Sequence, residues 1–121
     1  MQHFNKKKPF KAAFDGLKIA YSTQKHVRLH LFSTGWVLVS GWFLHVSVIE
    51  WCILLLCIAM VIGAELINTA LEQLADYVKP DYHPIIGKAK DIAAASVLCI
   101  SLFATVIGLI IFLPKIINLI S

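Results

Sequence analysis

The feature that most constrains this chain is an uncharged apolar run from Ile92 to Leu113. Its 22 residues would extend about 33 Å as an α-helix, which matches a membrane hydrocarbon core of about 30 Å. A second run, Trp51 to Ala64, also lacks charge. Because 59% of the chain is hydrophobic and only 15% is charged, it is too apolar for an ordinary soluble domain. The sequence therefore predicts an all-α membrane protein with a single domain over residues 1–121.

An amphipathic helix is expected at residues 9–28. Pro9 suits the first turn of a helix. Apolar side chains then recur at helical spacing, on the side opposite Lys and Asp side chains; they are Phe10, Phe14, Leu17 and Tyr21. This pattern predicts a surface helix that lies in the headgroup plane of the membrane.

Three membrane-spanning helices are expected after the surface helix. Small residues such as Gly35 and Gly41 in the first span would let helices approach closely. Pro80 and Pro84 cannot sit in a regular helix interior, so they predict a break between the second and third spans, and Pro114 is expected to close the third. The expected spans are residues 29–47, 50–76 and 91–113, with a cytoplasmic loop at 77–90.

The basic residues predict the orientation of these spans. Of 11 Lys and Arg residues, ten lie in the N-terminal segment and in the 77–90 loop, and one, Lys115, lies on the opposite side. Such a bias places the N-terminus in the cytoplasm and the C-terminus outside. The pattern indicates membrane topology, and no nucleic-acid partner is expected.

A stripe of polar residues interrupts the second span near its cytoplasmic end. Glu65, Asn68, Glu72 and Asp76 follow one another at intervals of three, four and four residues, so they share one helix face. Glu65 would lie inside the hydrocarbon, where an acid is costly unless it faces a bundle interior or a wet cavity. A helix end that surfaces into water would explain Asp76 and Glu72, but it explains Glu65 and Asn68 poorly. The stripe therefore predicts a functional site.

Two further pairs allow more than one interpretation. Lys90 and Asp91 could mark the start of a helix, where the positive end of the helix dipole stabilises the Asp91 carboxylate. Alternatively, Lys90 could bind phosphate oxygens while the acids opposite hold a metal ion. His26 and His30 have the i, i+4 spacing of metal ligands, although polar contacts at the membrane interface are the expected role.

At these residues the chain resembles the small integral-membrane prokaryotic diacylglycerol kinases and undecaprenol kinases. The matching motifs are E-x-x-N-x-A-x-E-x-x-x-D from Glu65 to Asp76, A-K-D from Ala89 to Asp91, F-x-G-L from Phe14 to Leu17 and R-x-H from Arg28 to His30. No glycine-rich loop of the soluble phosphate-binding scaffolds occurs in the sequence. The resemblance implies one surface helix and three spans per subunit, and a homotrimer in the bacterial inner membrane.

The resemblance also implies the reaction, which is transfer of the γ-phosphate of ATP, with Mg²⁺, to a lipid alcohol. The segment Pro80-x-Tyr82-His83-Pro84 and the AKDIAAASVL that follows are closer to the undecaprenol kinases, so undecaprenol is preferred as substrate and diacylglycerol comes second. Phosphoryl transfer needs mainly positioning and charge neutralisation, which carboxylates, a metal ion and one Lys supply.

The family's functional residues carry over onto matching positions here. The catalytic residues would be Glu65, as the base, and Asn68, and Glu72 would be a Mg²⁺ ligand. Gln24 stands where the family usually has a metal-binding Glu, and its neutral amide oxygen would be a weaker Mg²⁺ ligand than a carboxylate. Four residues would bind the nucleotide: Asp76, Gly87, Lys90 and Asp91.

The competing function is a small proton- or ion-conducting membrane subunit with Glu65 as the carrier. This function predicts an isolated carboxylate near the middle of the membrane. It leaves the clustered acids and Lys90-Asp91 at one cytoplasmic rim unexplained.

Overall fold

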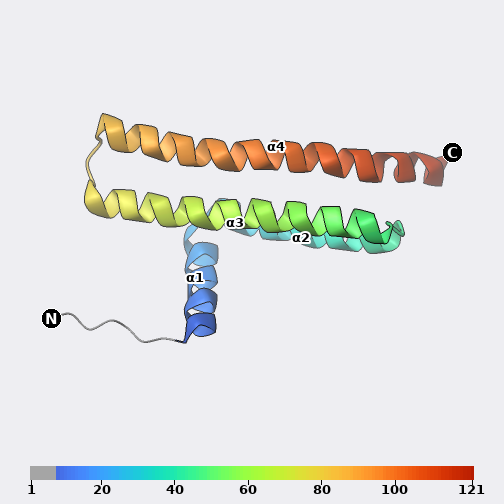
Figure 1. The fold of residues 1–121 in the computed structure, drawn as a ribbon, viewed down its shortest axis with the longest axis horizontal. Coiled ribbons are helices and arrows are strands. Elements are labelled where there is room, and N and C mark those ends of the chain that lie inside the picture. Colours follow the sequence, from blue (N-terminus) through green and yellow to red (C-terminus); the bar gives the residue numbers. More distant parts are fainter. Residues whose placement is uncertain (1–7) are drawn as a thin grey trace.

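The computed structural model describes residues 8–121, which form four α-helices and no strand (Figure 1). Helices α2, α3 and α4 lie side by side, with α3 packed against both of the others, while α1 lies across their direction and contacts α2 and α3. Lys6 and Lys7, which contribute to the predicted orientation, lie outside the described residues. The bounds are α1 Pro9–Thr23, α2 Lys25–Phe43, α3 Val48–Val78 and α4 Pro84–Ile120.

The first difference from the expected helices is a break at Gln24. The surface helix was expected to continue to residue 28, but α1 ends at Thr23 and α2 begins at Lys25. Gln24 has an extended backbone, with φ −120° and ψ 115°, and this turns the chain from α1 into α2. Arg28 secures the corner, because its Nη1 donates a hydrogen bond of 2.6 Å to the carbonyl oxygen of Tyr21.

Two expectations based on proline were wrong. The loop expected at 77–90 is confined to residues 79–83, because α4 begins at Pro84. Pro84 occupies the first turn of α4, where a backbone N–H has no acceptor within the helix, so the missing N–H of proline costs nothing. The ring Nδ1 of His83 accepts a hydrogen bond of 3.2 Å from the N–H of Ile85. Pro114 does not close the last helix but lies inside α4, which continues to Ile120. The next residue, Lys115, forms an ion pair with Glu50 of α3, with 3.0 Å between Nζ and Oε1.

The turn between α2 and α3 is tight and ends in a capping box. His45 adopts a positive φ of 56°, and the N–H of Val46 donates a 3.2 Å hydrogen bond to the carbonyl of Gly41. The hydroxyl of Ser47 accepts from the N–H of Glu50 at 3.1 Å, and the Glu50 carboxylate accepts from the N–H of Ser47 at 2.8 Å. The helix expected to reach residue 47 therefore ends at Phe43, because the turn that follows needs a left-handed residue.

Gly41→Ala is expected to destabilise the protein by about 1 to 3 kcal/mol, because an added Cβ would lie 2.7 Å from Cη2 of Trp51 and overpack the contact. The measurement is thermal unfolding in detergent micelles. The matched control is Gly35→Ala on the same helix, where a Cβ meets no described atom within 4 Å. Equal stability of the two variants would contradict this packing.

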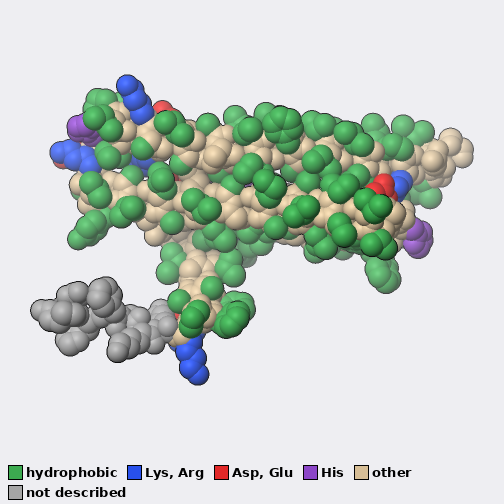
Figure 2. All heavy atoms as spheres, viewed as in Figure 1, with side chains coloured by type: hydrophobic (Ala, Val, Ile, Leu, Met, Phe, Trp, Pro, Cys, Tyr) green, Lys and Arg blue, Asp and Glu red, His purple; other side chains and the backbone are tan. Residues whose placement is uncertain are grey.

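Most apolar side chains of the described chain point outwards. Helices α3 and α4 are the two that are long and apolar enough to cross a membrane, yet only 11% and 6% of their most apolar windows are buried. Figure 2 shows hydrophobic side chains along the length of this pair, with charged side chains gathered at its two ends. A core helix of a soluble protein would instead bury its apolar face. The all-helical class predicted from the sequence is confirmed.

Candidate active site

Glu65 lies buried on the inner face of α3, with 6% of its surface exposed. Its carboxylate Oε1 is 3.7 Å from Nε2 of His30, which reaches it from α2. The hydroxyl of Thr69 donates a 2.8 Å hydrogen bond to the backbone carbonyl of Glu65, so it leaves the carboxylate itself untouched. The structure thus places the predicted base beside an imidazole that sequence reasoning assigned only to polar or metal contacts. The R-x-H motif, which was matched only to the family, was the sequence signal that could have indicated a site role for His30.

One helix turn further along, Asn68 and Glu72 contact each other. Nδ2 of Asn68 donates a hydrogen bond of 3.0 Å to Oε1 of Glu72. Oδ1 of Asn68 is buried and accepts no hydrogen bond from the described residues. A buried acceptor without a donor is costly, so it marks a position where a cation or a donor from a ligand would be favourable.

The last residue of the polar stripe contacts α4. Nζ of Lys90 donates a hydrogen bond of 2.6 Å to Oδ1 of Asp76, which joins two of the four residues predicted to bind the nucleotide. Asp91, the next residue, is exposed. The helix-start explanation of Asp91 is wrong, since α4 begins at Pro84. The cross-helix ion pair holds the ammonium group at the Asp76 end of the polar stripe.

Gly87, also predicted to contact the nucleotide, lies on the first turn of α4 beneath Tyr82. A Cβ added to Gly87 would approach Cε1 of Tyr82 to 3.2 Å. The ring of Tyr82 is largely exposed, so it could move aside. The glycine therefore permits a close approach of the 79–83 loop to α4.

Two possible metal positions lie near the start of α2, namely Gln24 and the His26–His30 pair, and they have different surroundings. Gln24 is half-buried at the corner between α1 and α2, and its side chain makes no capping hydrogen bond. His26 is exposed, whereas His30 faces Glu65. Within residues 8–121 no three His, Cys, Asp or Glu side chains gather into a metal-binding group. The His26–His30 pair therefore lacks the further ligands of a zinc-type site.

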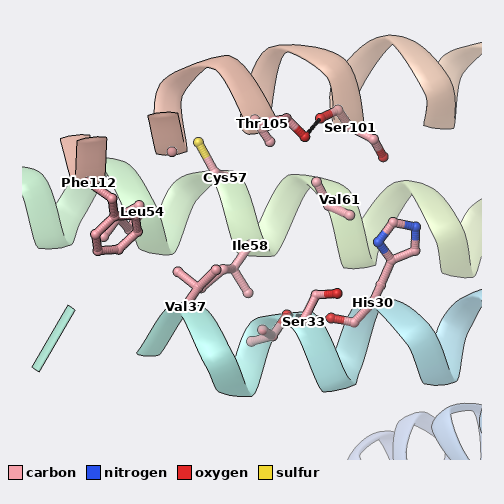
Figure 3. Close-up of a pocket in the computed structure, with 13 residues that line it drawn as sticks. His30, Ser33, Val37, Leu54, Cys57, Ile58, Val61, Ser101, Thr105 and Phe112 are labelled. Carbon is pink, nitrogen blue, oxygen red and sulfur yellow. Dashed lines mark hydrogen bonds between the residues drawn. The ribbon is translucent and has the colours of Figure 1, made fainter. Parts of the chain in front are cut away.

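A cavity of about 360 Å³ between α2, α3 and α4 leads away from this polar cluster (Figure 3). His30 stands at one end of it, and Phe112 and Leu54 stand toward the other. Most of the lining is apolar, with hydroxyl groups from Ser33, Thr34, Ser101 and Thr105. Sequence spacing could not reveal this space, because it depends on how three helices are set against one another.

The sequence profile of the prokaryotic diacylglycerol kinase family matches residues 11–112. The chain belongs to this family. It is 36% identical to the undecaprenol kinase of Bacillus subtilis over 108 residues, and the aligned region covers 89% of this chain and 88% of that protein. It is 35% identical over 111 residues to the diacylglycerol kinase of Synechocystis sp., covering 91% and 63%, and 34% identical over 104 residues to that of Helicobacter pylori, covering 84% and 81%.

Membership of this family identifies the chain as a lipid-alcohol kinase and implies ATP-dependent phosphotransfer. It favours this function over the ion-conducting subunit. Together with the two long apolar helices, it also indicates a membrane location. The kinase prediction made from the Glu65 to Asp76 motif is confirmed, while the roles of the individual residues stay predictions.

Proposed function

We propose that this protein phosphorylates undecaprenol at the cytoplasmic face of the bacterial inner membrane, with diacylglycerol as the second candidate substrate. The observation that carries the proposal is a buried carboxylate, Glu65, placed where a polar row of side chains meets an apolar cavity. A lipid alcohol has the same division between a reactive polar end and a hydrocarbon chain. The relatives named above act on such alcohols, according to their names.

Glu65 is the proposed general base. The hydrocarbon chain of the alcohol occupies the cavity between α2, α3 and α4, and its hydroxyl points past His30 to the Glu65 carboxylate. The carboxylate takes the proton as the hydroxyl oxygen attacks the γ-phosphorus of ATP, and ADP leaves with the electron pair of the broken phosphorus–oxygen bond. The low exposure of Glu65 also keeps water, which would compete with the alcohol as the nucleophile, away from the base.

Glu72 is the proposed ligand of Mg²⁺, and the catalytic role proposed for Asn68 is to help Glu72 hold this ion. The ion usually keeps several waters and binds one or two carboxylates together with substrate phosphates, so a complete protein cage is not required. The Glu72 carboxylate and the buried, unpaired Oδ1 of Asn68 fit such a partial site. When bound there, Mg²⁺ neutralises charge on the phosphates. Gln24 would be a weaker ligand than the Glu that the family usually carries.

Lys90, Asp76, Gly87 and Asp91 form the proposed nucleotide side of the site. The ammonium group of Lys90 can bind phosphate oxygens as a point charge. Its 2.6 Å contact with Asp76 holds it on the same end of the bundle as Glu72. In this arrangement Asp76 positions the cation, and Gly87 leaves room for the nucleotide beside the backbone of α4.

The proposed membrane placement has α1 in the cytoplasmic headgroup plane and α2, α3 and α4 as three spans, with the C-terminus outside. In Figure 1, α3 and α4 continue past α1 at the end where the 79–83 loop joins them. From Val48 to Glu65, α3 rises about 26 Å, so Glu65 would lie near the boundary of a hydrocarbon core of about 30 Å. The exposed apolar faces of α3 and α4 are compatible with a homotrimer, which would shield part of them.

The function is tested by the transfer of labelled phosphate from ATP to each alcohol in mixed micelles with Mg²⁺. Undecaprenol is expected to be labelled faster than a diacylglycerol at equal mole fraction. A faster reaction with the diacylglycerol would reverse the order of substrates. Absence of transfer to both alcohols would contradict the proposed function.

Gly108→Leu is expected to raise the KM for the lipid alcohol about tenfold or more, because the new side chain would occupy the cavity that Gly108 lines. A tenfold change corresponds to about 1.4 kcal/mol of lost binding. The KM for ATP should stay unchanged. The matched control is Gly35→Leu, at a helical glycine outside the cavity lining where an added Cβ also meets open space. Equal KM values for the lipid in the two variants would place the hydrocarbon chain elsewhere.

A further inference from the structure

We propose that His30 is a positioning residue that orients the carboxylate of Glu65 for catalysis. The inference rests on the proposed function, in which Glu65 is the base. A carboxylate as buried as that of Glu65 needs a partner, because burying an unpaired charge is costly. The side chain that the structure places against it is that of His30, with Nε2 3.7 Å from Oε1.

His30 is held in place by α2 and not by the element that carries the base. The carbonyl oxygen of His30 accepts a 2.8 Å hydrogen bond from the hydroxyl of Thr34. Val27, about one turn earlier on the same helix, has only 2% of its surface exposed, so this part of α2 is packed against the rest of the protein. The imidazole therefore projects from a fixed backbone towards Glu65 of α3.

The imidazole is also the boundary between the base and the cavity. His30 lines the cavity, where Figure 3 shows it projecting from α2 towards α3, and its side chain keeps 25% of its surface exposed. At 3.7 Å the two atoms lie just beyond hydrogen-bonding distance, so a shift of a few tenths of an ångström brings them into contact.

This arrangement assigns different tasks to the two carboxylate oxygens. The N–H of His30 engages Oε1 and holds the plane of the carboxylate. Oε2 is left to accept the proton of the alcohol. This proton passes from the hydroxyl oxygen to Oε2 as that oxygen bonds to the γ-phosphorus, and the bond from phosphorus to the bridging oxygen breaks, so that ADP leaves with its electron pair. A base oriented by a third group in this way recurs in enzymes that activate hydroxyl nucleophiles. A neutral imidazole with its proton on Nε2 is sufficient for this task.

The test compares His30→Ala, His30→Gln and the matched control His26→Ala, which alters an exposed histidine on the same helix. His30→Ala is expected to lower kcat about 10- to 100-fold, the loss that typically follows removal of a group that orients a functional ligand. The KM for ATP should not change. The midpoint of thermal unfolding should fall, because the buried Glu65 carboxylate loses its partner, so kcat is measured well below that midpoint. His30→Gln, which retains an N–H donor, should recover part of the loss, and His26→Ala should behave as the unaltered protein.

A double-mutant cycle separates positioning from an independent effect of His30. In the Glu65→Gln background, adding His30→Ala should change the residual rate less than threefold, because the carboxylate that His30 orients is gone. An equal loss from His30→Ala in both backgrounds would overturn the proposal. So would a loss confined to the KM for the lipid.

A readout that does not need activity distinguishes this proposal from the proposed function. The chain has three Glu residues, so in protein labelled with ¹³C at the Glu side-chain carboxyl the Glu65 signal is assigned by its loss in Glu65→Gln. His30→Ala should move this signal and His26→Ala should not. An unmoved signal in His30→Ala refutes the contact. If the unaltered protein phosphorylates neither alcohol, the kinase function fails while the NMR signal still decides the role of His30.

Discussion

Glu65→Gln is expected to lower the rate of phosphate transfer about 10²- to 10⁴-fold, the usual effect of removing a general base. The amide keeps the volume of the side chain but cannot accept the proton of the alcohol. The measurement is kcat for labelled-phosphate transfer in micelles at saturating ATP and lipid. Because the substitution removes a buried acid, the midpoint of thermal unfolding should not fall.

Glu50→Gln is the matched control, since it makes the same change at the other end of α3. Glu50 accepts a hydrogen bond from the N–H of Ser47 at 2.8 Å and pairs with Lys115 at 3.0 Å. This variant should lose stability and keep its activity, which is the reverse of the pattern at Glu65. Near-normal turnover in purified Glu65→Gln would show that another group takes the proton.

Lys90→Met is expected to raise the KM for ATP about 10- to 100-fold, because a hydrogen bond to a charged group contributes about 1.5 to 3 kcal/mol and each 1.4 kcal/mol is a factor of ten. The KM for the lipid alcohol should not change. The loss of the Asp76 contact should have little effect on folding, since the Asp76 side chain is 63% exposed. Initial rates over an ATP titration at fixed lipid provide the measurement.

Lys88→Met serves as the control for Lys90→Met, because Lys88 is an exposed lysine on the same helix two residues earlier. Its KM for ATP should match that of the unaltered protein. A shift in the lipid KM in Lys90→Met, with an unchanged ATP KM, would assign Lys90 to the lipid headgroup instead of the phosphates.

Proline shows where local sequence patterns are insufficient. The two prolines at 80 and 84 correctly indicated a break, but Pro84 begins α4 and does not belong to the loop. Pro114 lacks one helix hydrogen bond, yet α4 continues past it, since the surrounding turns and the Lys115–Glu50 contact hold the chain in a helical path. A tertiary contact therefore supports the helix after Pro114, whereas Pro84 begins α4 for the local reason that the first turn of a helix accepts proline.

The sequence by itself determined the helical class, the polar stripe on α3 and the kinase family. These features depend on hydrophobic periodicity and on residue order, which are local properties of the chain. The three-residue and four-residue spacing from Glu65 to Asp76 already places these side chains on one face of a helix. The same spacing explains why Asn68 and Glu72, at i and i+4, could form their hydrogen bond within α3.

Only the tertiary structure decided which helices meet at the candidate site. The contact between His30 and Glu65, the ion pair between Asp76 and Lys90, and the cavity that begins at His30 all join different helices. Their geometry depends on how far each helix is rotated about its axis and shifted along its neighbour, and spacing within one helix carries no information about either. The side-chain packing that sets this rotation and shift is therefore what brings the histidine to the buried acid.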